Sequence, residues 1–290
     1  MLIRSIVKLD LWFTEYQKDG FGITIKVKES LFHEASKFQT VDIIDTEAFG
    51  RMLLLDGLVM TSEKDEFFYH EMISHIPMLS HPEPKQVLVI GGGDGGTVRE
   101  VLKHKSVERV VLCEIDSFVI DACRRYLPTI AGMLDDPRVD IQVRDGIEYI
   151  AGQKSQFDII LVDSTDPMGP GEGLFTEEFY KNVNAALKPG GIMAAQSESP
   201  VANKREMSLM YPLLRKAFPI VSTFVGPIPT YPGGYWSWAF CSNDVKPLGF
   251  FDETRAEEIA QSCKLYNPDI QKAAFVLPNF VKEILIPVTN

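Results

Sequence analysis

The sequence has no long apolar run and few cysteines, and each shortage excludes a class of protein. No stretch approaches the ~20 apolar residues that a helix needs to cross a bilayer, and charged residues interrupt the first eight positions, where a signal peptide would be apolar. The cysteines, Cys113, Cys123, Cys241 and Cys263, lack the C-x-x-C spacing of redox or zinc motifs. We therefore expect a cytoplasmic protein with reduced thiols, no membrane partner and no bound metal.

Basic residues are also in short supply. The chain has 29 Lys and Arg against 40 Asp and Glu, which gives a net charge of −11 at pH 7. Such a surface repels phosphate backbones, so no nucleic-acid partner is expected. It attracts cations, which is consistent with a cationic substrate without proving one. With 290 residues, 45% of them hydrophobic, the chain is long enough for a sizeable core in one or two domains.

Residues 1–62 are predicted to form a small antiparallel β domain. Apolar and polar residues alternate over 21–28, over 40–45 and less regularly over 51–55, and the Asp56-Gly57 pair predicts a hairpin before 58–60. A helix is predicted over 65–79, ended by the prolines that follow it. We place the boundary to a second domain, residues 63–290, at the start of this helix.

From residue 86 onward, short apolar strands alternate with helices. Strands are predicted over 87–90, 109–113, 139–143, 157–162 and 192–195, with helices over 117–126 and 176–187 among the connections. This alternation predicts an α/β fold with a Rossmann-like, methyltransferase-type, doubly wound and mostly parallel sheet, covered by helices on both faces. Ligands in such sheets bind beyond the carboxyl ends of the strands, so the residues after each strand are the candidates for chemistry.

The first three strands end in residues that suit a nucleoside. Gly91, Gly93 and Gly96 match G-x-G-x-x-G, which allows a close approach of backbone and ligand but also fits a plain strand-to-helix turn. Glu114 ends the second strand 23 residues after Gly91, where a carboxylate can accept both hydroxyls of a ribose. Asp145 follows the third strand and either accepts the amine of an adenine or merely begins a turn.

The fourth strand runs directly into two carboxylates, Asp163 and Asp166, on a loop rich in proline and glycine. With Asp94 and Glu114 they form a cluster that repels itself unless cations neutralise it. Asp163 ends the strand and is held more rigidly than Asp166, so we predict that Asp163 is the general base and that Asp166 positions an amine. The flanking glycines and prolines predict a loop that can close as a lid.

Asp94 discriminates between nucleoside ligands. A carboxylate inside the glycine turn would repel the pyrophosphate of NAD and the carboxylate of S-adenosylmethionine. Decarboxylated S-adenosylmethionine presents only an ammonium there, and Asp94 can pair with it. The sequence thus favours this molecule as a co-substrate, with no separate cofactor.

These motifs resemble those of the polyamine aminopropyltransferase family over most of the chain. The resemblance is carried by residues 55–57 (LDG), 65–72 (DEFFYHEM), 89–96 (VIGGGDGG), 113–116 (CEID), 163–170 (DSTDPMGP) and 228–232 (IPTYP). It implies transfer of an aminopropyl group from decarboxylated S-adenosylmethionine to putrescine, which gives spermidine and 5′-methylthioadenosine. It also implies a homodimer or homotetramer.

The resemblance implies roles for further residues. The matching nucleoside-site residues are Gln39, Asp94, Glu114, Asp145, Gly146 and Pro170. The matching diamine-site residues are Trp12 at the far end, Tyr69, His70, Asp94, Asp163, Ser164, Asp166, Gln196 and Tyr231, with Asp163 as the base. Without the resemblance, Tyr69 is also consistent with a core residue, and His70 is equally consistent with a surface residue of its helix.

Other functions stay open at this stage. The acceptor could be cadaverine, agmatine or spermidine instead of putrescine, because the sequence does not give the length of the pocket. A putrescine N-methyltransferase would use intact S-adenosylmethionine. A non-catalytic polyamine-binding module on the same fold would bind putrescine without turnover, but it would not need both Asp163 and Asp166.

Overall fold

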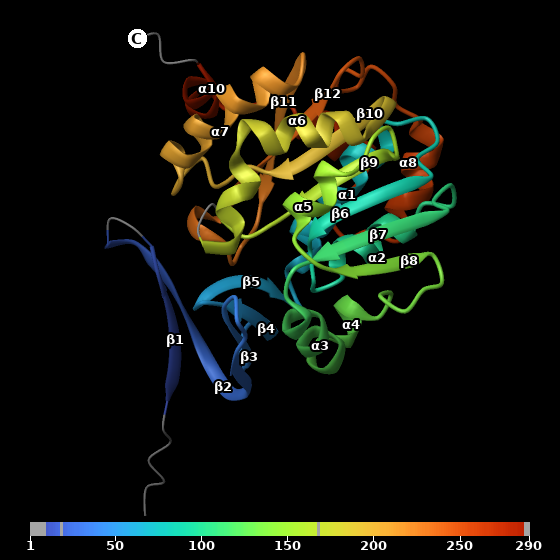
Figure 1. The fold of residues 1–290 in the computed structure, drawn as a ribbon. Helices are drawn as coiled ribbons and strands as arrows, with labels where there is room; N and C mark the ends of the chain where they lie inside the picture. Colours follow the sequence, from blue (N-terminus) through green and yellow to red (C-terminus); the bar gives the residue numbers. More distant parts are fainter. Residues whose placement is uncertain (1–9, 18–19, 167–168, 287–290) are drawn as a thin grey trace, which may run out of the picture.

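A computed structural model describes residues 10–17, 20–166 and 169–286, which form two β-sheets of different kinds (Figure 1). The first is an antiparallel five-stranded sheet whose strands follow chain order. Its strands are β1 (Leu11–Tyr16), β2 (Gly22–Ala35), β3 (Thr40–Thr46), β4 (Gly50–Leu55) and β5 (Leu58–Ser62). The three predicted strand patterns and the hairpin at Asp56-Gly57 are confirmed, and β1 is an additional strand.

Alternating apolar residues give the small sheet two different faces. Ile43 and Leu53 are paired across β3 and β4 and belong to the same core as the larger domain. Their neighbours Ile44 and Met52 point to the other face and form a small separate cluster. The sheet is therefore attached to the rest of the molecule through one apolar face.

The second sheet has seven strands in the order β11-β12-β10-β9-β6-β7-β8. Its strands are β6 (Gln86–Gly91), β7 (Arg109–Glu114), β8 (Val139–Val143), β9 (Phe157–Asp163), β10 (Leu187–Gln196), β11 (Ile220–Pro227) and β12 (Tyr235–Ser242). The five from β6 to β10 are parallel, while β12 is antiparallel to both of its neighbours. The predicted mostly parallel, Rossmann-like sheet is confirmed; the antiparallel pair β11 and β12 is an addition.

Helices cover both faces of this sheet, as the near-continuous apolar strands require. The helices α1, α2, α3 and α8 share a core cluster with Val87 and Val89, and α5, α6, α7 and α10 share one with Leu88 and Ile90. The helices are α1 (Glu66–Leu79), α2 (Gly96–Leu102), α3 (Ser117–Tyr126), α4 (Pro128–Ala131), α5 (Gly146–Ala151), α6 (Glu177–Ala186), α7 (Lys204–Ala217), α8 (Glu253–Ala260), α9 (Pro268–Ala273) and α10 (Asn279–Leu285), with 3-10 turns η2 (Gly169–Phe175) and η3 (Pro232–Gly234).

The chain order of the sheet reverses between β6 and β9. From β6 the chain adds β7 and β8 on one side and then returns to place β9 and β10 on the other. Such a reversal opens a crevice at the carboxyl ends of the two central strands. The small N-terminal sheet lies against this end of the large sheet (Figure 1).

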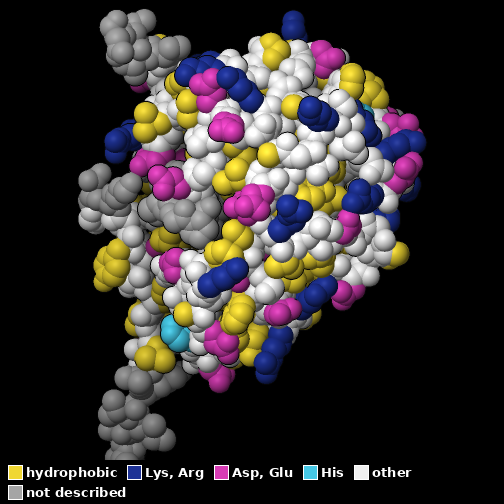
Figure 2. All heavy atoms as spheres, viewed as in Figure 1, with side chains coloured by type: hydrophobic (Ala, Val, Ile, Leu, Met, Phe, Trp, Pro, Cys, Tyr) yellow, Lys and Arg dark blue, Asp and Glu magenta, His cyan; other side chains and the backbone are white. Residues whose placement is uncertain are grey.

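The described residues include no candidate membrane span, and the face seen in Figure 2 has no single basic area. Among the described residues, no helix is long and apolar enough to cross a bilayer. On the face seen in Figure 2, acidic and basic side chains are interspersed, so the lysines and arginines visible there do not gather in one area.

Candidate active site

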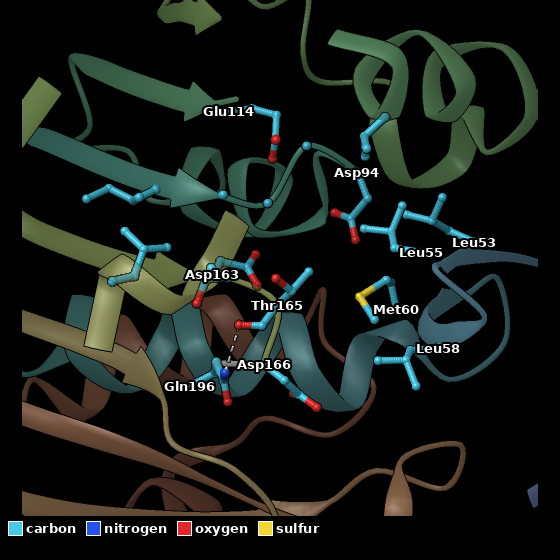
Figure 3. Close-up of a pocket in the computed structure, with 18 of the residues that line it drawn as sticks. Leu53, Leu55, Leu58, Met60, Asp94, Glu114, Asp163, Thr165, Asp166 and Gln196 are labelled. Carbon is cyan, nitrogen blue, oxygen red and sulfur yellow. Dashed lines mark hydrogen bonds between the residues drawn. The ribbon is translucent and has the colours of Figure 1, made fainter. Parts of the chain in front are cut away.

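A cavity lies between the carboxyl ends of β6, β7 and β9 and the strands β4 and β5 of the small sheet (Figure 3). Asp94, Glu114, Asp163 and Asp166 all line it, so the predicted acidic cluster forms within one cavity. Apolar side chains of the N-terminal sheet cover the opposite wall; these are Leu53, Leu55, Leu58 and Met60.

The glycine turn brings the end of β6 against the end of β9. Gly91 has a φ of 80°, and a Cβ atom there would lie 2.2 Å from the carbonyl oxygen of Asp163. The next residue, Gly92, donates its N–H to that same oxygen at 2.8 Å. Only glycine permits this approach, so the turn fixes the backbone of the candidate base.

The Asp163 side chain is held by two hydroxyl groups. Thr97 donates to Oδ2 at 2.6 Å, and Tyr69 donates a second hydrogen bond. Burial and the negative charge of Asp94 raise the pKa of Asp163 above its usual range, although these hydrogen bonds and the charge of His70 oppose the shift. A carboxylate with a raised pKa is better matched to accepting a proton from an amine.

Asp94 differs from Asp163 in its charge balance. Its Oδ1 accepts the Gly96 N–H at 2.8 Å, and its Oδ2 lies 3.4 Å from Nε2 of His70. Burial alone would raise the pKa of Asp94, but the charge and hydrogen bond of His70, together with the Gly96 N–H, lower it. Asp94 is therefore the ionised partner of the pair and offers negative charge at the glycine turn.

His70 and Tyr69 are both buried, so the alternative of a surface histidine is wrong. His70 is 2% exposed, and its Nδ1 lies 2.6 Å from Oε2 of Glu66. Burial opposes protonation of this ring, but Asp94 and Glu66 prevail and raise the pKa of His70 well above its usual range. Tyr69 is both a core residue and part of the cavity wall.

At the β7 end of the cavity lies Glu114, a buried carboxylate. Its Oε1 accepts the Asp116 N–H at 2.8 Å. Burial raises the pKa of Glu114 to about 7. Asp116 caps α3 and accepts a hydrogen bond from the Gln39 side chain at 3.1 Å, which joins the N-terminal sheet to the β7 end of the cavity.

Asp145, Gly146 and Pro170 are the other residues predicted for the nucleoside site. Asp145 and Gly146 line the cavity, and the Asp145 side chain caps α5 by accepting the Ile147 N–H at 2.7 Å. The side chain of Pro170 lies outside what the structure describes, as do residues 167–168 of the predicted lid, and both remain predictions.

Three of the predicted diamine-site residues lie at the β9, β10 and η3 end of the cavity. Gln196 donates to the carbonyl of Thr165 at 3.4 Å, as the dashed line in Figure 3 shows. Tyr231 donates to the carbonyl of Met60 at 2.5 Å, and the hydroxyl of Ser164 is buried without a protein partner.

The structure does not place Trp12 at the cavity. Strand residues alternate between two faces, and Trp12 is on the outer face of β1 with 57% of its surface exposed. Glu15 and Gln17 face inward and line the cavity instead. Glu15 is 2% exposed, accepts the Val59 N–H at 2.7 Å and the Gln17 amide at 2.7 Å, and has a pKa raised by burial.

Sequence reasoning missed Glu15 and Thr97. The only signal for Glu15 was an acidic residue inside an alternating strand, and for Thr97 a hydroxyl one residue after the glycine motif.

A group of potential metal ligands lies apart from the cavity. Within the described ranges, ligand atoms of His75, Glu100 and Cys263 lie within 4.8 Å of one another. Glu100 is already paired with Lys103 at 2.5 Å and Arg99 at 2.9 Å. This carboxylate is therefore neutralised by side chains of the protein, and the expectation of no metal remains a prediction.

The fold and the cavity together define a class: a Rossmann-like α/β protein whose cavity at the strand ends is lined by a cluster of carboxylates suited to cations. Two family models match the chain. The model described as spermine/spermidine synthase domain matches residues 66–253, and the spermidine synthase tetramerisation domain matches residues 11–63. The chain belongs to the spermine/spermidine synthase family, a family of transferases.

Individual relatives agree with this assignment over nearly the whole chain. Polyamine aminopropyltransferases of Shouchella clausii and Bacillus subtilis are each 48% identical, covering 96% and 95% of this chain and 100% and 99% of theirs. A crystal structure of spermidine synthase in complex with the transition state analogue AdoDATO has a TM-score of 0.93 at 45% identity, covering 95% of this chain and 94% of that one. The spermidine synthase of Thermotoga maritima has a TM-score of 0.91 at 44% identity with the same coverage.

Proposed function

We propose that the protein transfers the aminopropyl group of decarboxylated S-adenosylmethionine to putrescine, which produces spermidine and 5′-methylthioadenosine. The observation that carries the proposal is a pair of carboxylates that line one cavity and whose pKa values shift in opposite directions: the pKa of buried Asp94 is lowered and that of half-buried Asp163 is raised. One stays charged to hold a cation, and the other is suited to take up a proton. The titratable pair thus has two distinct roles.

The donor would lie along the strand ends. Glu114 would accept the ribose hydroxyls, and Asp145 with Gln39 would contact the base and ribose region. Asp94 would pair with the aminopropyl ammonium. The ionised state of Asp94 also supports the decarboxylated donor over intact S-adenosylmethionine, whose carboxylate would meet like charge in a buried site.

The acceptor amine must lose a proton before it can attack. Asp163 would take that proton, while Asp166, Tyr69 and Gln196 would orient the nitrogen. The nitrogen lone pair then forms a bond to the carbon next to sulfur, and the carbon–sulfur electron pair returns to sulfur as a neutral thioether. Alignment of the three atoms is worth roughly 7–11 kcal/mol in favourable cases, and no metal is needed to stabilise the leaving group.

The second amine of putrescine would meet Glu15. This carboxylate lines the same cavity as Asp163 but comes from β1 of the other sheet. The raised pKa of Glu15 reflects a buried charge that is incompletely compensated within the protein. A distal ammonium would compensate it, and the separation of the two anchors would select acceptors by length.

We also propose a homo-oligomer, a homodimer or homotetramer, located in the cytoplasm. The match of residues 11–63 to a tetramerisation domain supports association. The outward apolar side chains of the first hairpin, Trp12 and Tyr16, would be covered by it. The free state of the four cysteines supports a reducing compartment.

The test is product formation followed by mass spectrometry. Purified protein would receive decarboxylated S-adenosylmethionine with putrescine, cadaverine, agmatine or spermidine, in the presence of a chelator. We expect spermidine and 5′-methylthioadenosine from putrescine, and a rate about a hundred- to ten-thousandfold lower in Asp163→Asn, as for loss of a general base. Asp121→Asn, which makes the same change on the exposed face of α3, should keep full activity.

Different results would point elsewhere. A faster reaction with another amine would change the acceptor. Methylated putrescine from intact S-adenosylmethionine would identify a methyltransferase, and putrescine binding without any product would indicate a binding module.

A further inference from the structure

The side chain of His70 lies between two carboxylates. Its Nδ1 is 2.6 Å from Oε2 of Glu66, and its Nε2 is 3.4 Å from Oδ2 of Asp94. A neutral imidazole has one donor and one acceptor nitrogen. Either neutral tautomer would therefore turn a lone pair toward a carboxylate oxygen. Only the imidazolium, with a proton on each nitrogen, can donate to both carboxylates, so this geometry fits a positively charged His70.

The ring has no room to turn away from these partners. A Cβ atom on Gly96 would lie 2.2 Å from Cε1 and 2.3 Å from Nδ1 of His70, so the ring packs directly on the backbone at the start of α2. The ring of Tyr69 stands edge-on to it at 5.6 Å. These two contacts hold the ring between Glu66 and Asp94.

The charged groups around the ring come from four elements. Glu66 belongs to α1, Asp94 to the glycine turn, Asp163 to the end of β9 and Arg99 to α2. Arg99 donates to the same Oε2 of Glu66 at 2.6 Å. Arg99 also pairs with Glu100, which Lys103 neutralises in turn. The three carboxylates Glu66, Asp94 and Asp163 thus face two cations, His70 and Arg99, which leaves a small excess of negative charge at the ring.

A bound donor would change this balance. It brings an ammonium to Asp94 and a sulfonium nearby, so two cations would compete for one carboxylate at short range. Like charges that share a buried site repel strongly, and one of them gives up its charge. Of the two, the imidazole has the far lower ordinary pKa, so His70 is the group that loses a proton.

We propose that His70 is a proton switch for donor binding: it is an imidazolium in the empty site and a neutral ring in the complex. The proton on Nε2 leaves to solvent, and the exposed lone pair then accepts a hydrogen bond from the donor's ammonium. Nδ1–H continues to donate to Glu66, which fixes the tautomer. This inference rests on the proposed function, because it requires an aminopropyl ammonium at Asp94.

Glu66 and Arg99 act as positioning residues in this switch. Glu66 holds the ring through Nδ1, and Arg99 shares the carboxylate oxygen that holds it. By drawing negative charge away from the ring, Arg99 lets the second proton leave when the donor arrives. Neither residue lines the cavity, so each acts through His70.

The test counts protons. Binding heats would be measured in buffers of different ionisation enthalpy, with decarboxylated S-adenosylmethionine and with 5′-methylthioadenosine. The second ligand shares the nucleoside but lacks the ammonium, so any proton exchanged by Glu114 appears with both. We expect up to one more proton released with the donor, and no such excess in His70→Gln, whose amide is always neutral.

The pH dependence has a defined sign. Because binding releases a proton, the Kd of the donor relative to that of 5′-methylthioadenosine should fall about tenfold per pH unit as the pH rises toward the pKa of His70 in the empty site. Above that pKa the ratio should be constant. Glu66→Gln removes one of the two carboxylates that raise the pKa of His70, so the pH at which the ratio becomes constant should move to a lower value.

A second measurement needs no variant. In wild-type protein with 15N-labelled histidine, one ring should change from the imidazolium pattern to the Nδ1–H tautomer when the donor is added, but not when 5′-methylthioadenosine is added. Equal proton counts for the two ligands, or an equal excess in His70→Gln, would overturn the inference while leaving the proposed function intact. Failure of the donor to bind at all would overturn both.

Discussion

Thr97 donates a hydrogen bond of 2.6 Å to Oδ2 of Asp163, which joins the first turn of α2 to the end of β9. Together with the hydroxyl of Tyr69 on α1, it fixes the rotamer of the candidate base from two elements that are independent of β9. Residues of the protein itself therefore hold the candidate base in place.

Loss of this hydroxyl should weaken the base. A hydrogen bond to a charged group contributes about 1.5–3 kcal/mol, so Thr97→Val should lower kcat about ten- to a hundredfold. Because Thr97 lowers the pKa of Asp163, its removal should also move the acidic limb of the rate–pH profile to higher pH. Thr97→Ser keeps the hydroxyl and should retain both values. A Thr97→Val enzyme with a wild-type profile would contradict this role.

Glu114 should make nucleoside binding depend on pH near neutrality. Its pKa is about 7 in the empty site, and only the ionised form can accept hydrogen bonds from both ribose hydroxyls. Calorimetry with 5′-methylthioadenosine should show affinity falling up to about tenfold per pH unit below about 7. Glu114→Gln should bind more weakly with a flat profile; a variant with wild-type pH dependence would assign the titration to another group.

Glu15 should distinguish diamines from monoamines. With the distal anchor neutralised, Glu15→Gln should raise the KM for putrescine about ten- to a hundredfold, as expected for a hydrogen bond to a charged group. The KM for 1-aminobutane, which has no second amine, should change little. Glu29→Gln, on the exposed part of β2, is the matched control. Equal effects on both amines would show that Glu15 does not contact the distal nitrogen.

Gly96 should be required for the packing of His70. Gly96→Ala places a methyl group against the ring and should cost about 1–3 kcal/mol of unfolding free energy, as overpacked sites do. In a His70→Ala background the same substitution should cost much less, and urea unfolding of the four proteins measures the coupling. Gly152→Ala, which meets only the Tyr149 carbonyl at 3.9 Å, should be near neutral. Additive effects would exclude the contact.

The first hairpin should carry the contact between subunits. Tyr16 is 82% exposed and Trp12 is 57% exposed, so a charge at either position would be buried at a cost on association. Light scattering should show a lower mass for Trp12→Lys and Tyr16→Lys than for wild type. Val276→Lys changes an exposed apolar residue far along the chain and should leave the mass unchanged. Unchanged mass in all three variants would place the interface elsewhere.

The sequence by itself determined the parallel strands of the large sheet and the acidic cluster at their carboxyl ends. Alternation of apolar strands and helices predicts a parallel sheet, and parallel strands necessarily bring their carboxyl ends to one edge. Asp94, Glu114 and Asp163 could therefore be placed together from their positions after three strands. The glycine motif could also be recognised from the sequence, because few residues other than glycine tolerate the positive φ of 80° that Gly91 adopts.

Only the tertiary structure decided which of two faces each remaining residue presents. Strand alternation separates Trp12 from Glu15 but does not say which face meets the cavity; the packing of one sheet on the other does. The helical pattern of α1 likewise leaves His70 between core and surface. The burial of His70 depends on Gly96, 26 positions further along the chain, because a residue with a Cβ atom there would collide with the ring. Contacts of this kind are set by shape complementarity between distant segments, and local periodicity carries no information about them.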